Sequence, residues 1–193
     1  KNLDVNDMGY LGRNDWLMFG GRYQIKKTDF SSDSLMRDRQ YELGWSLKTD
    51  SSFNKEPSSI RFSIDNQLKN SSQFKFGTFY RSEGRENRIT RNSPLAPFIN
   101  MPEGYGVEID FNGPRDNFFR YYLDAKREKG DGYSPELGWT SSYKGSVSIS
   151  PSDTLIATMS YRHTEESNWL NWINDNLLAT YDKKQRSTTA SIQ

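Results

Sequence analysis

An alternation of apolar and polar residues in steps of two runs through this chain and constrains its fold more than any other feature. In residues 41–48 every second side chain is apolar, and the same alternation recurs over 60–65, 107–112 and 119–126. Successive side chains of a strand point to opposite faces, so each segment builds one apolar and one polar surface. The pattern predicts an all-β, antiparallel sheet, and its repetition favours the wall of a transmembrane β-barrel of the outer-membrane type.

The alternation, together with the turn signals between its segments, predicts nine strands. They cover residues 14–26, 39–49, 59–67, 73–82, 105–113, 117–127, 143–150, 154–163 and 176–192. The last of these is either one long strand or a hairpin broken near residues 183–184. Short connectors rich in Gly, Pro, Asn and Ser alternate with longer polar ones, which we expect at 83–104, 128–142 and 164–175. Outer-membrane barrels alternate short periplasmic turns with long extracellular loops in this way, although the connection at 28–38 is longer than this scheme expects.

The average composition is polar, with a mean hydropathy of −0.91 and 26% charged residues. No apolar run approaches the ~20 residues that a membrane-spanning helix needs, which excludes helical insertion. A barrel is compatible with this composition, because only every second strand residue faces lipid. The formal charge of +1 and the lack of a clustered basic stretch argue against nucleic-acid binding.

The two faces of the predicted barrel wall follow from the same alternation. The residues that we expect to face lipid are Leu43, Trp45, Phe62, Ile109, Tyr121, Leu123, Ala157 and Met159. The residues that we expect to form a polar network facing the lumen are Arg61, Asp65, Glu108, Asp110, Arg120, Asp124 and Lys126. The alternative is a soluble β-sandwich, whose hairpins carry the same alternation.

Some of these charged residues also allow a catalytic interpretation. Glu108 and Asp110 lie on one face of a predicted strand, and Asp124 lies on the next strand. Two carboxyl groups ~5–9 Å apart with unequal pKa values can act as general acid and base in glycoside hydrolysis. We favour the ion-pair network, because Arg120 and Lys126 are predicted beside these carboxylates, and we expect no enzyme activity.

Metal and thiol chemistry find little support in the sequence. His163 is the only histidine, and the chain has no cysteine. A zinc site would need further nitrogen or sulfur ligands, so we expect neither a metal site nor a cofactor.

The segment 92–102 differs from the other connectors. Three prolines stiffen it, while several apolar side chains offer contacts. We expect it to form a lid or plug at the barrel mouth, or alternatively to pack on itself. The residues that would form this lid are Pro94, Pro97, Phe98 and Met101.

Two stretches of the chain resemble a known bacterial family. Residues 4–16 contain an Asn-Asp-hydrophobic-Gly-Tyr-hydrophobic-x-Arg core, and Trp169-x-x-Trp172 is followed by Asn-Leu-Leu at 176–178, Tyr181 and Gln185. Both are similar to stretches of outer-membrane proteins in which a module like carbohydrate-binding family 9 precedes a β-barrel of undefined function. The resemblance implies the outer membrane of a Gram-negative bacterium and a role related to glycans, and it implies no catalytic residues.

We therefore expect residues 1–193 to be a fragment of one outer-membrane barrel domain, without the N-terminal module and the closing strands. The expected partners are outer-membrane lipid and lipopolysaccharide, glycan and other envelope proteins. The expected function is that of a glycan-associated binding or transport component. The alternatives are a TonB-dependent type of transporter barrel, a scaffold barrel that holds partner proteins, and a carbohydrate-active enzyme.

Overall fold

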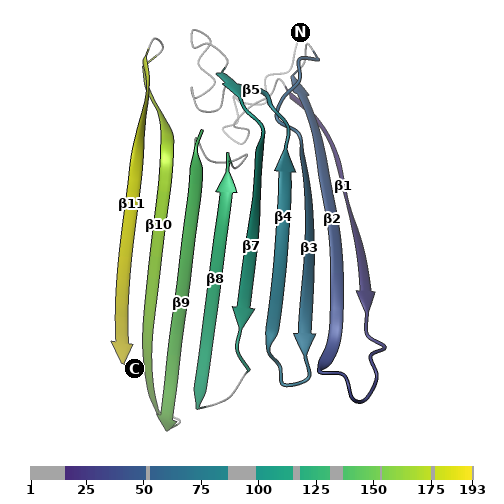
Figure 1. Ribbon diagram of the computed structural model, residues 1–193, viewed down its shortest axis with the longest axis vertical. Coiled ribbons are helices and arrows are strands. Elements are labelled where there is room, and N and C mark those ends of the chain that lie inside the picture. Colours follow the sequence, from purple (N-terminus) through teal and green to yellow (C-terminus); the bar gives the residue numbers. More distant parts are fainter. Residues whose placement is uncertain are drawn as a thin grey trace, which may run out of the picture.

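The computed structural model describes residues 16–50, 53–86, 99–114, 118–130, 137–152, 154–174 and 177–192. These residues form one antiparallel sheet of nine strands and a separate two-stranded hairpin, and they contain no helix. In the sheet, each strand pairs with the next one along the chain, apart from the hairpin that lies between the fourth and fifth strands (Figure 1). The predicted all-β, antiparallel fold is confirmed.

Four strands of the sheet, at residues 36–50, 59–68, 139–152 and 155–174, are longer than the alternation predicts, and the other five differ from the predicted length by at most one residue. The strands of the sheet are β1 (Trp16–Lys27), β2 (Met36–Asp50), β3 (Ser59–Leu68), β4 (Gln73–Arg81), β7 (Gly104–Asn112), β8 (Phe119–Lys129), β9 (Trp139–Ser152), β10 (Leu155–Asn174) and β11 (Leu177–Ile192). The hairpin consists of β5 (Gly84–Glu86) and β6 (Ile99–Met101).

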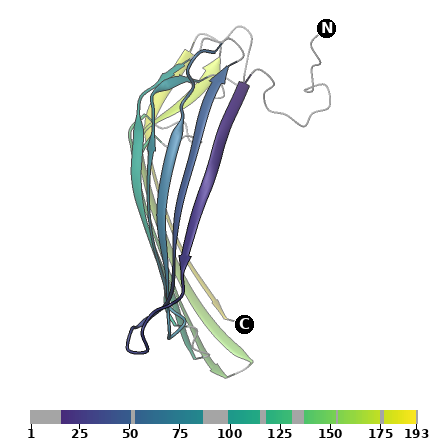
Figure 2. The same ribbon diagram turned by 90° about the vertical axis from the view of Figure 1, so that its right-hand side faces the viewer.

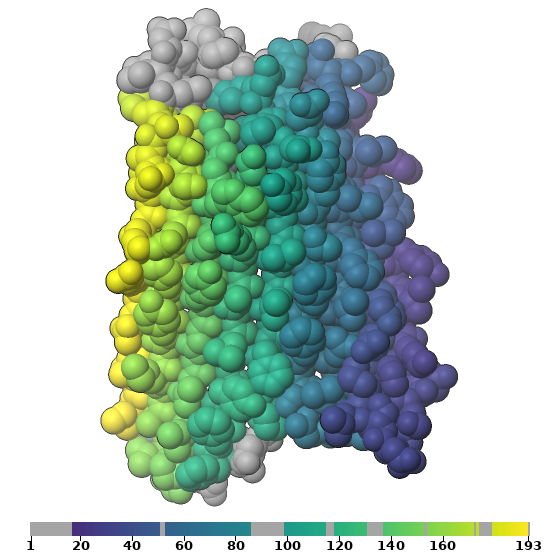
Figure 3. Space-filling model, viewed as in Figure 1, coloured from purple at the N-terminus to yellow at the C-terminus, as the bar shows by residue number. Residues whose placement is uncertain are grey.

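The described sheet is strongly curved and does not close into a barrel (Figure 2). Its edges are β1 and β11, which pair within the described residues only with β2 and β10. Side chains of neighbouring strands form one continuous surface from the purple edge to the yellow edge (Figure 3).

The expectation of a long loop at 164–175 is wrong. β10 continues to Asn174 and pairs with β11 along most of its length, so that His163 lies inside the strand. The register shifts between Glu166 and Trp169, and Asn168 has a φ of 52°. A β-bulge of this kind moves the next side chains to the opposite face and breaks the period of two. For this reason the alternation in the sequence did not predict the second half of the strand.

The loop expected at 128–142 is also shorter than predicted. β8 extends to Lys129 and β9 begins at Trp139, and these two residues are paired. At the other end of the sheet, β2 begins at Met36 rather than at residue 39, which shortens the connection after β1 to residues 28–35.

The register assigns each side chain to one of two faces. We call a set of directly paired residues, one from each strand, a row, and we count rows along one face, where successive rows are two residues apart. One such row holds Asp65, Lys75, Asp110, Asp124, Lys144 and Arg162. The adjacent position on each strand belongs to the opposite face, and there the row holds Ile64, Phe76, Ile109, Ala125, Tyr143 and His163. The sheet therefore has a polar face and an apolar face.

The two sets of residues predicted from the alternation separate onto these faces. All eight residues expected to face lipid lie on the apolar face, and all seven residues of the expected charged network lie on the polar face. Strand pairing thus brings together side chains that the sequence assigns to the same face from segments up to about a hundred residues apart.

Burial on this sheet is the reverse of that in a soluble domain. The apolar side chains of Ile109, Leu123 and Met159 are 42%, 57% and 60% exposed, whereas the carboxylates of Glu108 and Asp124 are only 19% and 11% exposed. Among the described residues, the buried hydrophobic side chains are Met101 and Leu170. Because side chains crowd together on the inside of a curved sheet and spread apart on its outside, the polar face is the concave one.

Candidate functional site

A balanced group of charges occupies the middle of the polar face. Asp110 and Asp124 are directly opposite each other on β7 and β8. Lys75 lies beside Asp110 on β4, and Lys144 lies beside Asp124 on β9. The Lys144 Nζ is 3.3 Å from Asp124 Oδ1. Two facing carboxylates repel each other, so the flanking lysines are needed to stabilise this arrangement.

Glu108 joins this group from the neighbouring row. Its Oε1 lies 3.4 Å from Lys75 Nζ and 3.7 Å from Arg61 Nη1. The Arg61 guanidinium also lies over the Phe79 ring, 5.5 Å from its centroid. Glu108 rests on Gly77, where an added Cβ would lie 2.6 Å from Oε1 and 2.7 Å from Cγ. The glycine thus gives the carboxylate room to reach both cations.

The cations beside the carboxylates differ in part from those expected. Arg120 lies two rows away from Asp124, at the end of the sheet, so it is not a neighbour of this group. Lys126 is opposite Glu108, as its strand position suggests, and its Nζ is 2.6 Å from Glu128 Oε1. The expectation that Arg120 accompanies the carboxylates is wrong, because four residues of extended strand, about 13 Å, separate it from Asp124.

Gly77→Ala should destabilise the protein, since the new methyl group displaces Glu108 from its two cations. Overpacking of this kind costs about 1–3 kcal/mol. The matched control is Gly44→Ala, because Gly44 lies on the same face and an added Cβ there meets nothing within 4 Å. Urea unfolding of both variants measures the difference, and equal stabilities would contradict the described position of Glu108.

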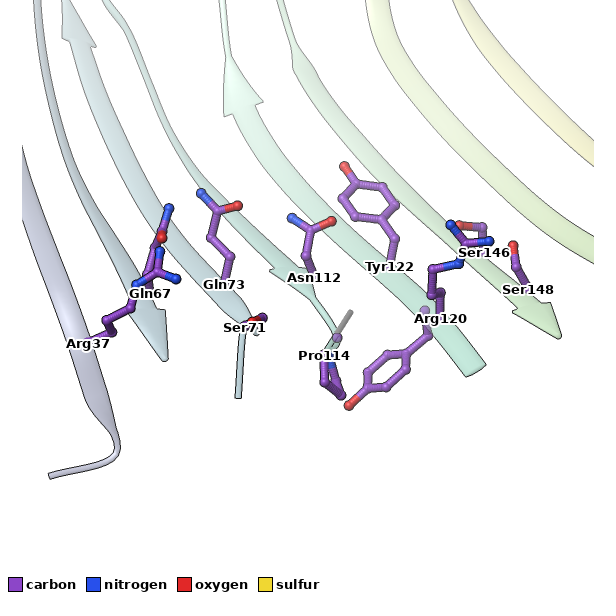
Figure 4. Close-up of a pocket in the computed structure, with 12 residues that line it drawn as sticks. Arg37, Gln67, Ser71, Gln73, Asn112, Pro114, Arg120, Tyr122, Ser146 and Ser148 are labelled. Atoms are coloured by element: carbon purple, nitrogen blue, oxygen red, sulfur yellow. The ribbon is translucent and has the colours of Figure 1, made fainter. Parts of the chain in front are cut away.

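A second feature of the polar face is a hollow of about 370 Å³ near the ends of the strands that carry the short turns. We call it the polar groove. Its floor is a row of uncharged polar side chains from five neighbouring strands (Figure 4). The residues of this row are Gln67, Gln73, Asn112, Tyr122 and Ser146. Arg37, Arg120 and Ser148 also line the groove.

Two of the predicted network residues, Asp65 and Asp110, lie in the next row of the polar face, toward the middle of the sheet. Gln73 Nε2 donates a hydrogen bond to Asp65 Oδ2 at 2.8 Å. The Tyr122 hydroxyl donates a hydrogen bond to Asp110 Oδ1 at 3.3 Å. The carboxylates thereby orient side chains that line the groove, leaving the Gln73 carbonyl oxygen outside that bond. Sequence reasoning found the carboxylates and Arg120 but missed the uncharged row, since glutamine, asparagine and serine on a strand give no distinctive signal.

The residues expected to form a lid can be placed only in part. Pro94, Pro97 and Phe98 lie outside the described residues. Met101 is in β6 and is 3% exposed. The hairpin that contains it is held to the connection between β2 and β3, because Arg85 N donates to Lys55 O at 3.0 Å.

The apolar face carries a band that crosses the sheet diagonally. On β2 the apolar stretch is 41–47, and on β10 it is 157–161. The middle of the β2 stretch is Gly44, and the row of Gly44 reaches Glu166 on β10. The middle of the β10 stretch is Met159, which lies seven residues along the strand from Glu166. Seven residues span ~24 Å and the six strand spacings between β2 and β10 span ~29 Å, so the band runs at about 40° to the rows.

Individual rows also show that the apolar band crosses them diagonally. The row with Leu43 on β2 ends in Glu165 on β10 and Lys184 on β11. The row with Arg39 on β2 reaches Tyr161 on β10. Each of these two rows therefore has one end inside the band and the other end outside it.

In the described ranges, no group of three or more histidine, aspartate or glutamate side chains is placed to hold a metal ion. No helix in this part of the chain is long and apolar enough to cross a membrane. In comparisons with known proteins, no protein-family model, no curated protein and no solved structure matches the chain.

Proposed function

We propose that this chain forms part of the wall of an outer-membrane β-barrel, with the apolar face against lipid and the polar face lining an aqueous interior. The observation that carries the proposal is the reversed burial, in which large apolar side chains cover the convex face and charged ones crowd the concave face. A soluble sheet would leave this apolar face in water, whereas lipid is a suitable solvent for it.

The diagonal band supports the same proposal. Strands of membrane barrels tilt by about 35–45° from the membrane normal, so the lipid-facing band must cross the hydrogen-bonded rows at that angle. The angle of about 40° in this sheet falls within that range. The band is therefore level in a membrane when the strands are tilted as in a barrel.

The described sheet has two open edges, β1 and β11, which are unfavourable in lipid. Unpaired N–H and C=O groups in hydrocarbon cost several kcal/mol each, so β1 and β11 need strand partners there. We propose that these residues are a fragment of one barrel domain, completed by strands outside the described sheet.

The long connections indicate which end of the barrel faces outward. β8 and β9 are joined by 130–138 at the end opposite the short turns, and long loops are extracellular in outer-membrane barrels. Above the apolar band at this end, the described part of the apolar face carries four basic residues, of which Lys184 forms an ion pair with Glu165 on the same face. The four basic residues are Arg127, Lys129, Lys184 and Arg186. The Arg127 guanidinium lies 5.0 Å from the centroid of the Trp139 ring. We propose that this border contacts the phosphate groups of lipopolysaccharide.

The function that this arrangement supports is a glycan-associated binding or transport component. Carboxylates, amides and hydroxyls on the concave face offer hydrogen bonds to hydroxyl-rich solutes in an aqueous interior. Reconstitution of the protein into lipid vesicles tests this function. We expect uptake of small sugars by vesicles that contain heat-modifiable, folded protein, and uptake no faster than in empty vesicles would argue against transport.

A further inference from the structure

The polar groove differs from the rest of the polar face in the kind of side chain that it presents. Its row contains amides and hydroxyls on five neighbouring strands. The next row toward the middle of the sheet contains charged residues on the same five strands: Asp65, Lys75, Asp110, Asp124 and Lys144. Uncharged hydrogen-bonding groups are thus concentrated on these five strands at one level of the polar face, and on β2 the same row holds Asp38, which contacts Arg37.

This row has the chemistry that recognises sugar hydroxyl groups. An amide both donates and accepts hydrogen bonds, as does a hydroxyl group, and each sugar hydroxyl also does both. Five strands span about 19 Å at ~4.8 Å per strand spacing, which is longer than a single sugar ring. The row therefore fits an extended chain of sugars lying across the strands.

Two arginines add a preference for negative charge. Arg37 lies at the β2 side of the groove, and Arg120 lies on β8 one row beyond Tyr122 (Figure 4). The Arg37 Nε contacts Asp38 Oδ2 at 3.2 Å, which uses one of the five N–H donors of the guanidinium. A guanidinium group matches carboxylate and phosphate in a two-pronged geometry.

We propose that the polar groove binds an acidic oligosaccharide, with the uncharged row contacting its hydroxyl groups and the two arginines contacting its carboxylate or phosphate groups. This inference rests on the proposed function, because the polar face must line an aqueous interior for such a ligand to reach it. Asp65 and Asp110 act as positioning residues through Gln73 and Tyr122.

Calorimetric titration of the purified protein in detergent micelles tests the proposal. The probes are hexagalacturonate, a phosphorylated oligosaccharide of the same length, and the neutral maltohexaose. We expect at least one acidic probe to bind about tenfold more tightly than maltohexaose, since a charged hydrogen bond contributes about 1.5–3 kcal/mol. The acidic probe that binds identifies carboxylate or phosphate as the preferred group.

Two double variants test separately the contribution of the arginines and that of the uncharged row to binding. Arg37→Gln/Arg120→Gln should remove most of the preference for the acidic probe, while Gln73→Leu/Asn112→Leu should weaken every probe about tenfold or more. The control is Arg22→Gln, which removes a cation of the same face outside the groove and should leave binding unchanged.

The contradicting results are equal affinities for acidic and neutral probes, no binding of either acidic probe, or binding that the groove variants do not change. Heat-modifiable migration in gel electrophoresis establishes for each variant that the protein is folded. Insertion of the same samples into lipid nanodiscs tests the proposed function separately. Failure of the protein to insert would contradict the membrane proposal, whereas insertion without binding of either acidic probe would contradict the groove proposal alone.

Discussion

Arginine in place of Leu123 should destabilise the folded protein in a lipid bilayer by about 2–4 kcal/mol, the cost of a cation near the midplane of a barrel's lipid face. Leu123 is 57% exposed on the apolar face, in the same row as Phe111 and Tyr161. Urea unfolding in lipid vesicles, followed by tryptophan fluorescence, measures this cost.

The control for this substitution is Ser146→Arg on the same pair of strands. Ser146 lies opposite Tyr122 on the polar face, one position along the strand from the row of Leu123. An arginine there would face an aqueous interior, so we expect it to cost much less. Equal costs at the two positions would contradict the assignment of the apolar face to lipid.

Lys144→Met should also destabilise the protein, by about 1–3 kcal/mol, because it leaves a crowded carboxylate without its cation in a pair of which Lys144 is 42% exposed. Asp124 is 11% exposed and faces Asp110 directly, so loss of the Lys144 Nζ at 3.3 Å leaves the two negative charges opposed. The free energy of unfolding at neutral pH, measured in the same vesicles, gives the size of the effect.

The double variant Lys144→Met/Asp124→Leu tests whether the effect comes from the ion pair. Removing both charges eliminates the unpaired carboxylate, so the double variant should be more stable than Lys144→Met alone. If the two variants are equally unstable, the lysine contributes through packing, and the charge network is not what stabilises this part of the sheet.

The faces of the sheet were predictable from sequence, because they depend only on whether a residue occupies an odd or an even position in a strand. Leu123 and Asp124 are adjacent in the chain and lie on opposite faces for that reason alone. The prediction needed no knowledge of strand neighbours. It holds wherever the strand has no bulge.

The second half of β10 could not be predicted in the same way. The bulge before Trp169 shifts the alternation, and the positive φ of Asn168 belongs to a conformation that a turn would share. A long polar segment with an interrupted period of two therefore has the composition of a loop. Its pairing with β11 is what extends the strand.

The partners within the candidate site depend on register, which the alternation leaves open. Lys75 and Lys144 come from strands on either side of β7 and β8, and only the exact pairing places them beside Asp110 and Asp124. A shift of two residues in one strand would retain both faces and exchange every one of these contacts. The polar groove depends on the same pairings across five strands.

Accessibility of spin labels along β8 in a bilayer tests the central claim most directly. The chain has no cysteine, so single cysteines at each position from 120 to 125 can be labelled without a background signal. We expect labels at 121, 123 and 125 to be accessible to oxygen dissolved in lipid, and labels at 120, 122 and 124 to be accessible to a water-soluble nickel complex. The same accessibility at odd and even positions, or the opposite alternation, would contradict a barrel wall with its apolar face in lipid.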